Sequence, residues 1–371
     1  MKAINIISFD VPYPANYGGV IDVFYKIKYF HSKGIEIHLH CFEYGRGIQK
    51  ELNKHCKSVN YYKRKTGISS QISTTPYIVK SRTSPQLKTN LLKNNYPILF
   101  EGLHSCFLLD DKDLQNRFKI FRESNIEHNY YNHLAKAEKN PVKKQYYKSE
   151  AKKLEKFEPI ITNANISFVV SLTDLEYFKE KYPNNKIEFA PSFHSGEDVN
   201  VKSGKGDYVL YHGNLSVVEN KNAAEFIINK LFQNLDVSLK IAGLNPDNDL
   251  INLVSKYPNI EIIQNPTDTE MDELITNAQI NLLYTEQATG LKLKLLNVLY
   301  NGRHCIVNSK MVTGTSLSNI CLVEDNITRL KELIQATFSK EINKQEIEKR
   351  KNVLLKDYSN ENSFQKIIES F

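Results

Sequence analysis

Two lysines at the start of a predicted helix are the residues of this chain best placed to do chemistry. The stretch Thr289-Gly-Leu-Lys-Leu-Lys294 follows an apolar strand pattern at 279–284 and opens a run with helical spacing. A helix N-terminus carries unpaired N–H groups and about half a positive charge, so lysines there oppose the helix dipole. We therefore expect an anion at the turn formed by Thr289, Gly290 and Leu291, with Lys292 and Lys294 as counter-charges. The alternative is an ordinary amphipathic helix with solvated lysines.

The length of the chain, 371 residues, indicates two domains. No apolar run approaches the ~20 residues that span a bilayer, and the apolar start at 2–9 lacks a cleavage site. The five cysteines are scattered, which fits neither a disulfide framework nor a thiolate zinc site. We expect a cytoplasmic protein with reduced cysteines.

Positive charge is concentrated in the first half. Residues 1–190 carry 30 Lys and Arg against 19 Asp and Glu, whereas the remainder carries 19 against 23. Such a surface suits nucleic acid, an anionic membrane or phosphate-bearing substrates. No nucleic-acid-binding signature is present, so we expect no nucleic-acid partner. A helix predicted at 141–157, with Val142 and Leu154 inward, displays six lysines that either solvate its outer face or contact anionic lipid headgroups.

The first half has the pattern of a parallel α/β domain. Strand patterns at 2–9 and 35–42 flank a helix that opens with Gly18 and Gly19. This glycine pair would let a ligand approach the backbone at the carboxyl edge of the sheet, or would simply give room for helix packing. A dinucleotide site with Glu43 on the ribose is disfavoured, because the Gly-x-Gly-x-x-Gly spacing is missing.

Two further segments of the first half hold candidate site residues. His104 ends a strand pattern at 97–104, where it either has a structural role or donates a hydrogen bond to a sugar hydroxyl or phosphate. The polar and aromatic stretch from Arg122 to Tyr131 follows another strand pattern and is expected to be a site loop. Residues 61–95 are expected to form surface loops and short helices.

The second half repeats the parallel α/β pattern after a loop-rich boundary near 190–206. Strand patterns at 208–212, 238–243 and 260–263 each end in glycine or asparagine, and a helix is predicted at 222–231. Small or adaptable residues should therefore line the ligand edge of this sheet: Gly213, Asn214, Gly243 and Asn265.

Two Rossmann-like domains that face one another across a cleft describe the GT-B fold, and the motifs resemble those of group 1 (family 4) retaining glycosyltransferases. The stretch 122–131 resembles the family's R-x-x-N-x-E-x-x-Y-Y, and Gly213 is followed by Asn220 as in the family. Residues 289–296 resemble the Gly-Thr-Gly-Ile-Lys-Leu-Lys-Ile-Leu-Glu-Ala motif of a lysine-bearing branch. The resemblance implies an acceptor-side domain at 1–190, a nucleotide-sugar domain at 191–355 and a helix at 356–371 that packs back on the first domain.

The resemblance also implies an activity and its residues. The expected reaction is retaining, metal-independent hexosyl transfer, without a cofactor, from a nucleotide diphosphate sugar to a glycan or lipid-linked acceptor in bacterial surface polysaccharide synthesis. The chain would act in the cytoplasm, with peripheral contact to the inner face of the membrane. Lys292 and His104 would stabilise the leaving group and the sugar, Arg122, Glu127 and His128 would orient the acceptor, and no general base is assigned. The implied donor-binding residues are Gly18, Gly19, Gly213, Asn214, Gly243, Asn265, Thr289, Gly290, Leu291, Lys294 and Asn297.

One position departs from the family pattern. Many relatives carry two glutamates around seven residues, and the equivalents here are Thr289 and Asn297. The first replacement is usual in the lysine-bearing branch, but Asn297 is not. An asparagine carbonyl still accepts a ribose hydroxyl's hydrogen bond, roughly half as strongly as a carboxylate. Two alternatives therefore stay open: a noncatalytic protein that binds nucleotide sugar or glycan, and a sugar-nucleotide epimerase with the same fold.

Overall fold

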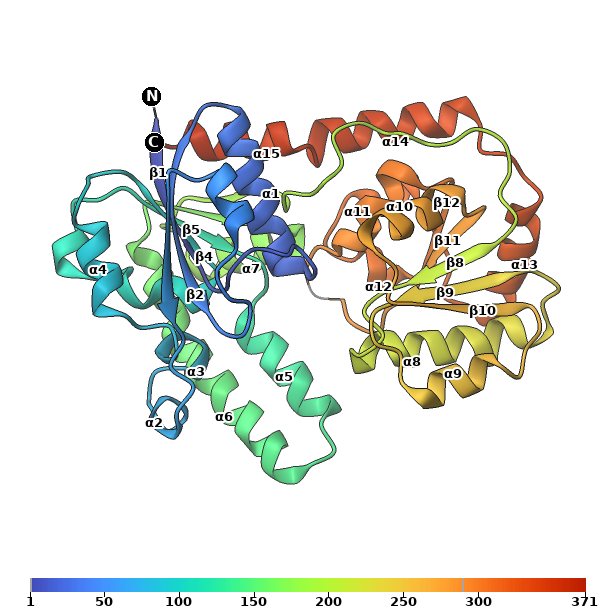
Figure 1. The fold of residues 1–371 in the computed structure, drawn as a ribbon, viewed down its shortest axis with the longest axis horizontal. Coiled ribbons are helices and arrows are strands. Elements are labelled where there is room, and N and C mark those ends of the chain that lie inside the picture. Colours follow the sequence, from blue (N-terminus) through green and yellow to red (C-terminus); the bar gives the residue numbers. More distant parts are fainter. Residues whose placement is uncertain (1, 289) are drawn as a thin grey trace. The chain divides into compact units, whose positions relative to one another are not determined.

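The computed structural model describes residues 2–288 and 290–371, which form two compact units (Figure 1). Of these residues, the first unit contains 2–194, 290–291 and 360–371, and the second contains 195–288 and 292–359. Each unit is built on its own parallel sheet, so each is described by itself.

The first unit is centred on a seven-stranded sheet with the order β3-β2-β1-β4-β5-β6-β7. All its paired strands run parallel. Strand β1 lies in the middle and its residues Ile4, Ile6 and Ile7 are fully buried, as expected when helices cover both faces of a sheet. The strands are β1 (Ala3–Ser8), β2 (Glu36–Glu43), β3 (Ser58–Lys63), β4 (Ile98–Glu101), β5 (Lys119–Glu123), β6 (Ile166–Val169) and β7 (Ile187–Phe189).

Helices pack on both faces of this sheet and form two apolar cores. One core joins α1 to α15 through Phe30, Phe364 and Ile367, and the other contains Leu87 of α4 and Phe178 of α7. Helices α5 and α6 follow one another as a hairpin that extends away from the sheet (Figure 1). The helices are α1 (Gly18–Ser32), α2 (Ile68–Gln71), α3 (Tyr77–Lys80), α4 (Pro85–Leu91), α5 (Glu127–Ala137), α6 (Pro141–Phe157), α7 (Leu172–Lys181) and α15 (Asn360–Ile368).

The second unit has a six-stranded parallel sheet with the order β10-β9-β8-β11-β12-β13. The strands are β8 (Val209–His212), β9 (Leu239–Gly243), β10 (Ile260–Gln264), β11 (Ile280–Leu283), β12 (His304–Val307) and β13 (Leu322–Val323). The helices are α8 (Val218–Phe226), α9 (Asn248–Val254), α10 (Asp268–Asn277), α11 (Leu293–Asn301), α12 (Ser309–Val312), α13 (Ile327–Phe338) and α14 (Lys344–Asp357).

In both sheets the strand order reverses direction between two central neighbours. The reversal lies between β1 and β4 in the first unit and between β8 and β11 in the second. Open α/β sheets bind ligands at the carboxyl ends of the strands at such switch points. These two edges are therefore where functional side chains are sought.

The predicted fold class, two parallel α/β domains, is confirmed, while several local predictions are corrected. Residues 61–63 belong to β3 instead of a loop, and the helix expected at 222–231 begins at Val218 and ends in a π turn at Ile227–Leu231. The stretch 122–131 is mostly regular structure, since it begins in β5 and continues into α5. Val142 is 77% exposed instead of inward, because the first turn of α6 lies at the far end of the hairpin. Within the described ranges, the longest helices are too short or too polar to cross a bilayer.

Candidate functional site

The carboxyl edge of the second sheet is shaped by close main-chain approach. A Cβ atom on Gly243 would overlap the carbonyl oxygen of Gly213, so the end of β9 has no room for a side chain, and a Cβ on Gly213 would lie 3.1 Å from Asn220 Cγ. Asn265 adopts a φ of +52° and its amide oxygen accepts a hydrogen bond from the N–H of Asn245 at 2.7 Å. At the next strand end, Asn214 Oδ1 accepts from Ser216 N at 3.1 Å. The residues predicted for this edge thus shape its loops.

Lys294 occupies the switch point of the second sheet. Its ammonium donates to Asn220 Oδ1 at 3.2 Å and lies 5.6 Å from the centroid of the Tyr211 ring. Glu219 stands beside it and accepts a hydrogen bond from the hydroxyl of Thr285. A lysine from α11, a glutamate and an asparagine from α8, a ring from β8 and a hydroxyl from the end of β11 therefore form one polar cage.

Asn308 holds the main chain of Thr285, one of the cage residues, in place. Its amide nitrogen donates to the carbonyl of Thr285 at 2.8 Å, and its amide oxygen accepts from the Thr285 N–H at 3.2 Å. This pair of bonds fixes the exit of β11. The Thr285 hydroxyl is thereby directed to Glu219.

Desolvation dominates the electrostatics of the cage. Burial lowers the pKa of Lys294 to about 8, with Glu219 opposing the shift and Lys292 adding to it. Burial, together with the Lys294 charge, lowers the pKa of His212 to about 3. The imidazole of His212 is therefore neutral, and its Nε2 atom is buried with no hydrogen-bond partner among the residues described. A partly desolvated ammonium beside an unsatisfied ring nitrogen is prepared for a polar, anionic ligand.

The start of α11 matches the predicted helix closely. Gly290 has a φ of +63°, Lys292 is the N-cap residue, and Lys294 lies in the first turn. Leu291 is half-buried. Thr289, which was predicted as part of the anion-binding turn, lies outside the described residues.

Asn297 faces other groups of its own unit. Its amide nitrogen donates to Asp272 Oδ1 at 3.4 Å, and its amide oxygen accepts from Asn301 Nδ2 at 2.7 Å. The oxygen that would accept a ribose hydroxyl is therefore already engaged within α11.

The switch point of the first sheet gathers a second set of side chains. A Cβ atom on Gly19 would lie 2.5 Å from Phe9 Cζ, whereas a Cβ on Gly18 would meet nothing. The Phe9 ring in turn lies 5.2 Å from the His104 ring, centroid to centroid. His104 stands in a 3-10 turn, Leu103–Leu108, directly after β4. The Phe9 ring therefore lies between Gly19 and His104 at this edge of the sheet.

His104 and Glu127 form a buried, weakly charged pair. The distance from His104 Nδ1 to Glu127 Oε1 is 3.8 Å, and this Nδ1 atom has no hydrogen-bond partner within the described ranges. Burial holds the pKa of His104 well below its usual value, and Arg82 and Arg64 lower it further. Burial raises the pKa of Glu127 to about 8, against the effect of Arg82. At neutral pH the pair is largely uncharged, so it suits hydrogen bonding to a hydroxyl group.

Arg82 connects two segments of the chain next to this site. Its guanidinium donates to the carbonyls of Phe9 at 2.6 Å and Ile78 at 2.7 Å, which ties the exit of β1 to α3. The side chain is 6% exposed. It lies in the segment 61–95 that was expected on the surface.

The structure places Arg122 and His128 in the interior instead of beside His104 and Glu127. Arg122 is 1% exposed, contacts Asp22 at 3.2 Å and donates to the carbonyls of Ala190 and Pro191. His128 Nδ1 lies 3.0 Å from Glu158 Oε2. Both side chains link elements of the first unit, since Arg122 is bonded to Asp22, Ala190 and Pro191, and His128 to Glu158.

Sequence reasoning missed several residues of these two sites. They are His212, Tyr211, Glu219, Thr285 and Asn308 in the second unit, and Arg82 in the first. The position of His212, Thr285 and Asn308 at or just after the ends of strands was a usable signal, because parallel strands end at one edge. Arg82 carried no such signal. No group of three metal-ligating side chains comes together in the described part of the chain.

The comparisons with known proteins agree on the fold. No family model matches the chain. A 44.6 kDa protein from the cps region of Klebsiella pneumoniae, described as uncharacterized, is 26% identical over 92% of this chain and 92% of its own. The sucrose-phosphate synthase of Thermosynechococcus elongatus matches 100% of this chain and 98% of its own, with a TM-score of 0.69 and 14% identity. Anabaena HepE, solved with UDP and glucose, matches 100% and 99% with a TM-score of 0.67 and 9% identity. The chain therefore has the GT-B fold.

Proposed function

We propose that this protein is a glycosyltransferase that takes its sugar from a nucleotide diphosphate sugar. In detail, we propose retaining, metal-independent hexosyl transfer of the group 1 (family 4) type, in the lysine-bearing branch. The acceptor is a glycan or lipid-linked glycan of a bacterial surface polysaccharide, and the enzyme works in the cytoplasm with peripheral contact to the membrane. The Klebsiella relative from a cps region and the UDP and glucose bound to Anabaena HepE support this assignment.

The observation that carries the proposal is the ammonium of Lys294, which lies within the polar cage although the side chain as a whole is half-buried. Among the residues that the structure describes, it has one neutral hydrogen-bond partner, Asn220, and one nearby carboxylate, Glu219, which is itself bonded to Thr285. Keeping a cation desolvated without a direct ion pair is unfavourable. A diphosphate at this edge would compensate the charge, and would also engage the N-terminus of α11.

The same charge accounts for catalysis in this proposal. When the glycosidic bond to the diphosphate breaks, negative charge builds on the leaving oxygen. A fixed ammonium already in place stabilises that charge without reorganisation, and removing one such contact typically costs about 10²–10³ in rate. Lys294, with Lys292 beside it, takes this role. His104 and Glu127 bind hydroxyl groups of the sugar or the acceptor.

Direct assay of a nucleotide-sugar panel tests the proposal. We expect release of the nucleoside diphosphate only when an acceptor glycan is present, with activity unaffected by EDTA. NMR of the product should show the anomeric configuration of the donor. An inverted product would refute the retaining mechanism, and dependence on an added metal would refute metal independence.

The engaged amide of Asn297 favours a second candidate, a noncatalytic protein that binds nucleotide sugar or glycan. Calorimetry that shows donor binding without turnover across the panel would support it. The third possibility, an epimerase, requires a changed sugar in the absence of acceptor. Incubating each donor alone therefore separates it from both other functions.

A further inference from the structure

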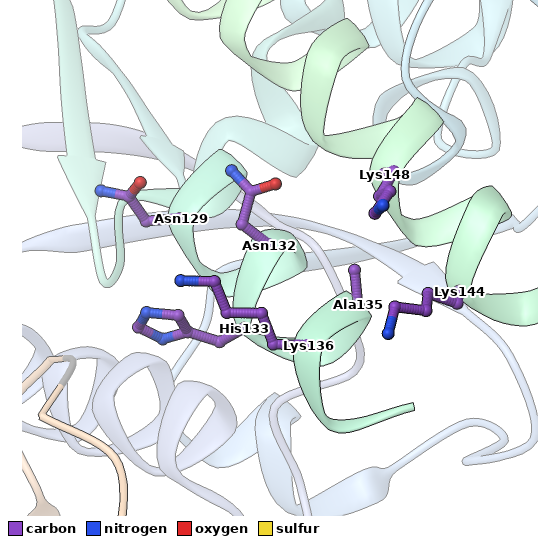
Figure 2. Close-up of a pocket in the computed structure, with 7 residues that line it drawn as sticks. All are labelled: Asn129, Asn132, His133, Ala135, Lys136, Lys144 and Lys148. Carbon is purple, nitrogen blue, oxygen red and sulfur yellow. The ribbon is translucent and has the colours of Figure 1, made fainter. Parts of the chain in front are cut away.

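The helical hairpin of the first unit carries an open surface pocket of about 550 Å³ between α5 and α6 (Figure 2). The pocket is lined by residues between 129 and 148, so neither His104 nor Glu127 lines it, although Glu127 begins the same helix α5. Lys294 belongs to the other unit. The lining residues are Asn129, Asn132, His133, Ala135 and Lys136 from α5, and Lys144 and Lys148 from α6.

The lining of the pocket is cationic and rich in hydrogen-bond donors. Lys144 and Lys148 are one helical turn apart on α6, and Lys136 approaches from the last turn of α5. No acidic side chain lines the pocket. Lys136 and Lys148 are exposed and Lys144 is half-buried, so the repulsion between Lys144 and Lys148 is small, and a bound anion would relieve it.

Among the described residues of the same unit, other lysines, unlike those of the pocket, are paired with a carboxylate. Lys153 of α6 pairs with Glu150 at 2.5 Å, and Lys181 of α7 pairs with Glu158 at 2.8 Å. Within the described part of the chain, Lys136, Lys144 and Lys148 have neither an ion pair nor a hydrogen bond of this kind. Their charges are available to a ligand.

The chemistry of the lining defines the class of ligand. Three lysines and two carboxamides supply donors for several oxygens, and only Ala135 contributes an apolar side chain. No arginine, phenylalanine or tyrosine lines the pocket, and the imidazole of His133 is the one ring among its lining residues, which argues against a row of stacked bases. Lysine binds phosphate as a point charge, and the volume lies in the range of small-ligand sites. We propose that this pocket binds a phosphate or diphosphate ester.

A matched pair of triple variants tests the proposal. The pocket variant is Lys136→Gln, Lys144→Gln and Lys148→Gln. The control variant is Lys143→Gln, Lys152→Gln and Lys156→Gln, which removes the same charge from exposed positions of α6 outside the pocket. Both are made in the full chain that also carries Lys294→Met, so that the proposed donor site does not bind the probe. Thermal melting checks that each variant folds.

Binding is measured with probes that distinguish two sources of phosphate. Calorimetry uses inorganic pyrophosphate and glycerol 3-phosphate, and sedimentation uses vesicles of phosphatidylcholine alone or mixed equally with phosphatidylglycerol. Each lysine near an anionic group contributes roughly fivefold in affinity, so the pocket variant should lose about a hundredfold. The control should stay within a few-fold. Asn132→Ala, which leaves the charge unchanged, should also weaken binding of a soluble ester.

The outcomes are separable. Loss of pyrophosphate or glycerol phosphate binding in the pocket variant alone supports a soluble phosphate ester as ligand. Loss confined to phosphatidylglycerol vesicles supports a lipid headgroup as the source of the phosphate. Absence of binding to every probe, or equal loss in both triple variants, overturns the proposal. None of these results depends on glycosyl transfer, so failure here leaves the proposed function untouched.

Discussion

Replacing Lys294 by methionine separates the functional from the structural role of the buried ammonium. The pKa of Lys294 falls from the ordinary value of 10.5 to about 8, mainly because the side chain is buried. A difference of this size means that keeping the charge in the folded protein costs about 3 kcal/mol at neutral pH. Methionine removes this cost, but it leaves Asn220 without its donor, which costs about 1–3 kcal/mol. The free protein should therefore be as stable as the wild type, or slightly more stable.

Turnover should respond in the opposite direction. Without the ammonium, charge on the departing diphosphate is less stabilised, so kcat should fall by about 10²–10³. Chemical denaturation and a steady-state donor assay measure the two effects on the same preparations. The matched control is Lys240→Met in β9, whose ammonium lies 4.6 Å from the Tyr208 ring centroid and 3.3 Å from a carboxylate oxygen of Glu261. This pair is more exposed, so the control should change stability by less than about 1 kcal/mol and leave turnover unchanged.

The pH dependence of the free energy of unfolding gives an independent check on the lowered pKa of Lys294. Between pH 8 and 10.5 the unfolded chain keeps the Lys294 proton while the folded protein releases it, so the free energy of unfolding rises with pH there. This rise should disappear in Lys294→Met. Donor affinity of the wild type should weaken above about pH 8, whereas Lys294→Arg should flatten that decline. Turnover within threefold of wild type in Lys294→Met, or a loss of activity that only follows a loss of folded protein, would refute the reasoning.

Three further predictions concern the other site residues. Burial raises the pKa of Glu127 from the ordinary value of 4.5 to about 8, so the free energy of unfolding falls as pH rises across this range. In urea titrations Glu127→Gln should make this fall shallower, while the exposed control Glu155→Gln should not. Asn297→Glu alone would put two carboxylates side by side, because Asn297 contacts Asp272. A gain in donor affinity is therefore expected in the double variant Asn297→Glu, Asp272→Asn. Unchanged donor affinity in this double variant would argue against a ribose contact. Gly243→Ala should destabilise by more than ~3 kcal/mol because its Cβ overlaps Gly213, whereas Gly18→Ala meets open space and should be neutral or stabilising by melting temperature.

Some of the structure followed from the sequence because its signals are local. Apolar runs bounded by glycine or asparagine located the central strands of both sheets, and the alternation of strands with helices required parallel pairing. The start of α11 was predicted for the same reason, since Gly290, the two lysines and the apolar spacing lie within one short stretch. Short or less apolar strands such as β3 and β13 carry weak periodicity and were missed.

The lysine at the start of a helix was thus determined by sequence, but its environment was not. Only the tertiary structure brought Tyr211 and Asn220 beside Lys294, because they lie on β8 and α8, and Asn220, the nearer of the two in the chain, precedes Lys294 by 74 residues. Burial is likewise a property of packing. It moved the pKa values of Lys294 and Glu127 toward neutrality, and it placed Arg122 in the interior despite its motif. Residue types set which charges were available, and the packed fold decided which of them are desolvated and therefore able to bind.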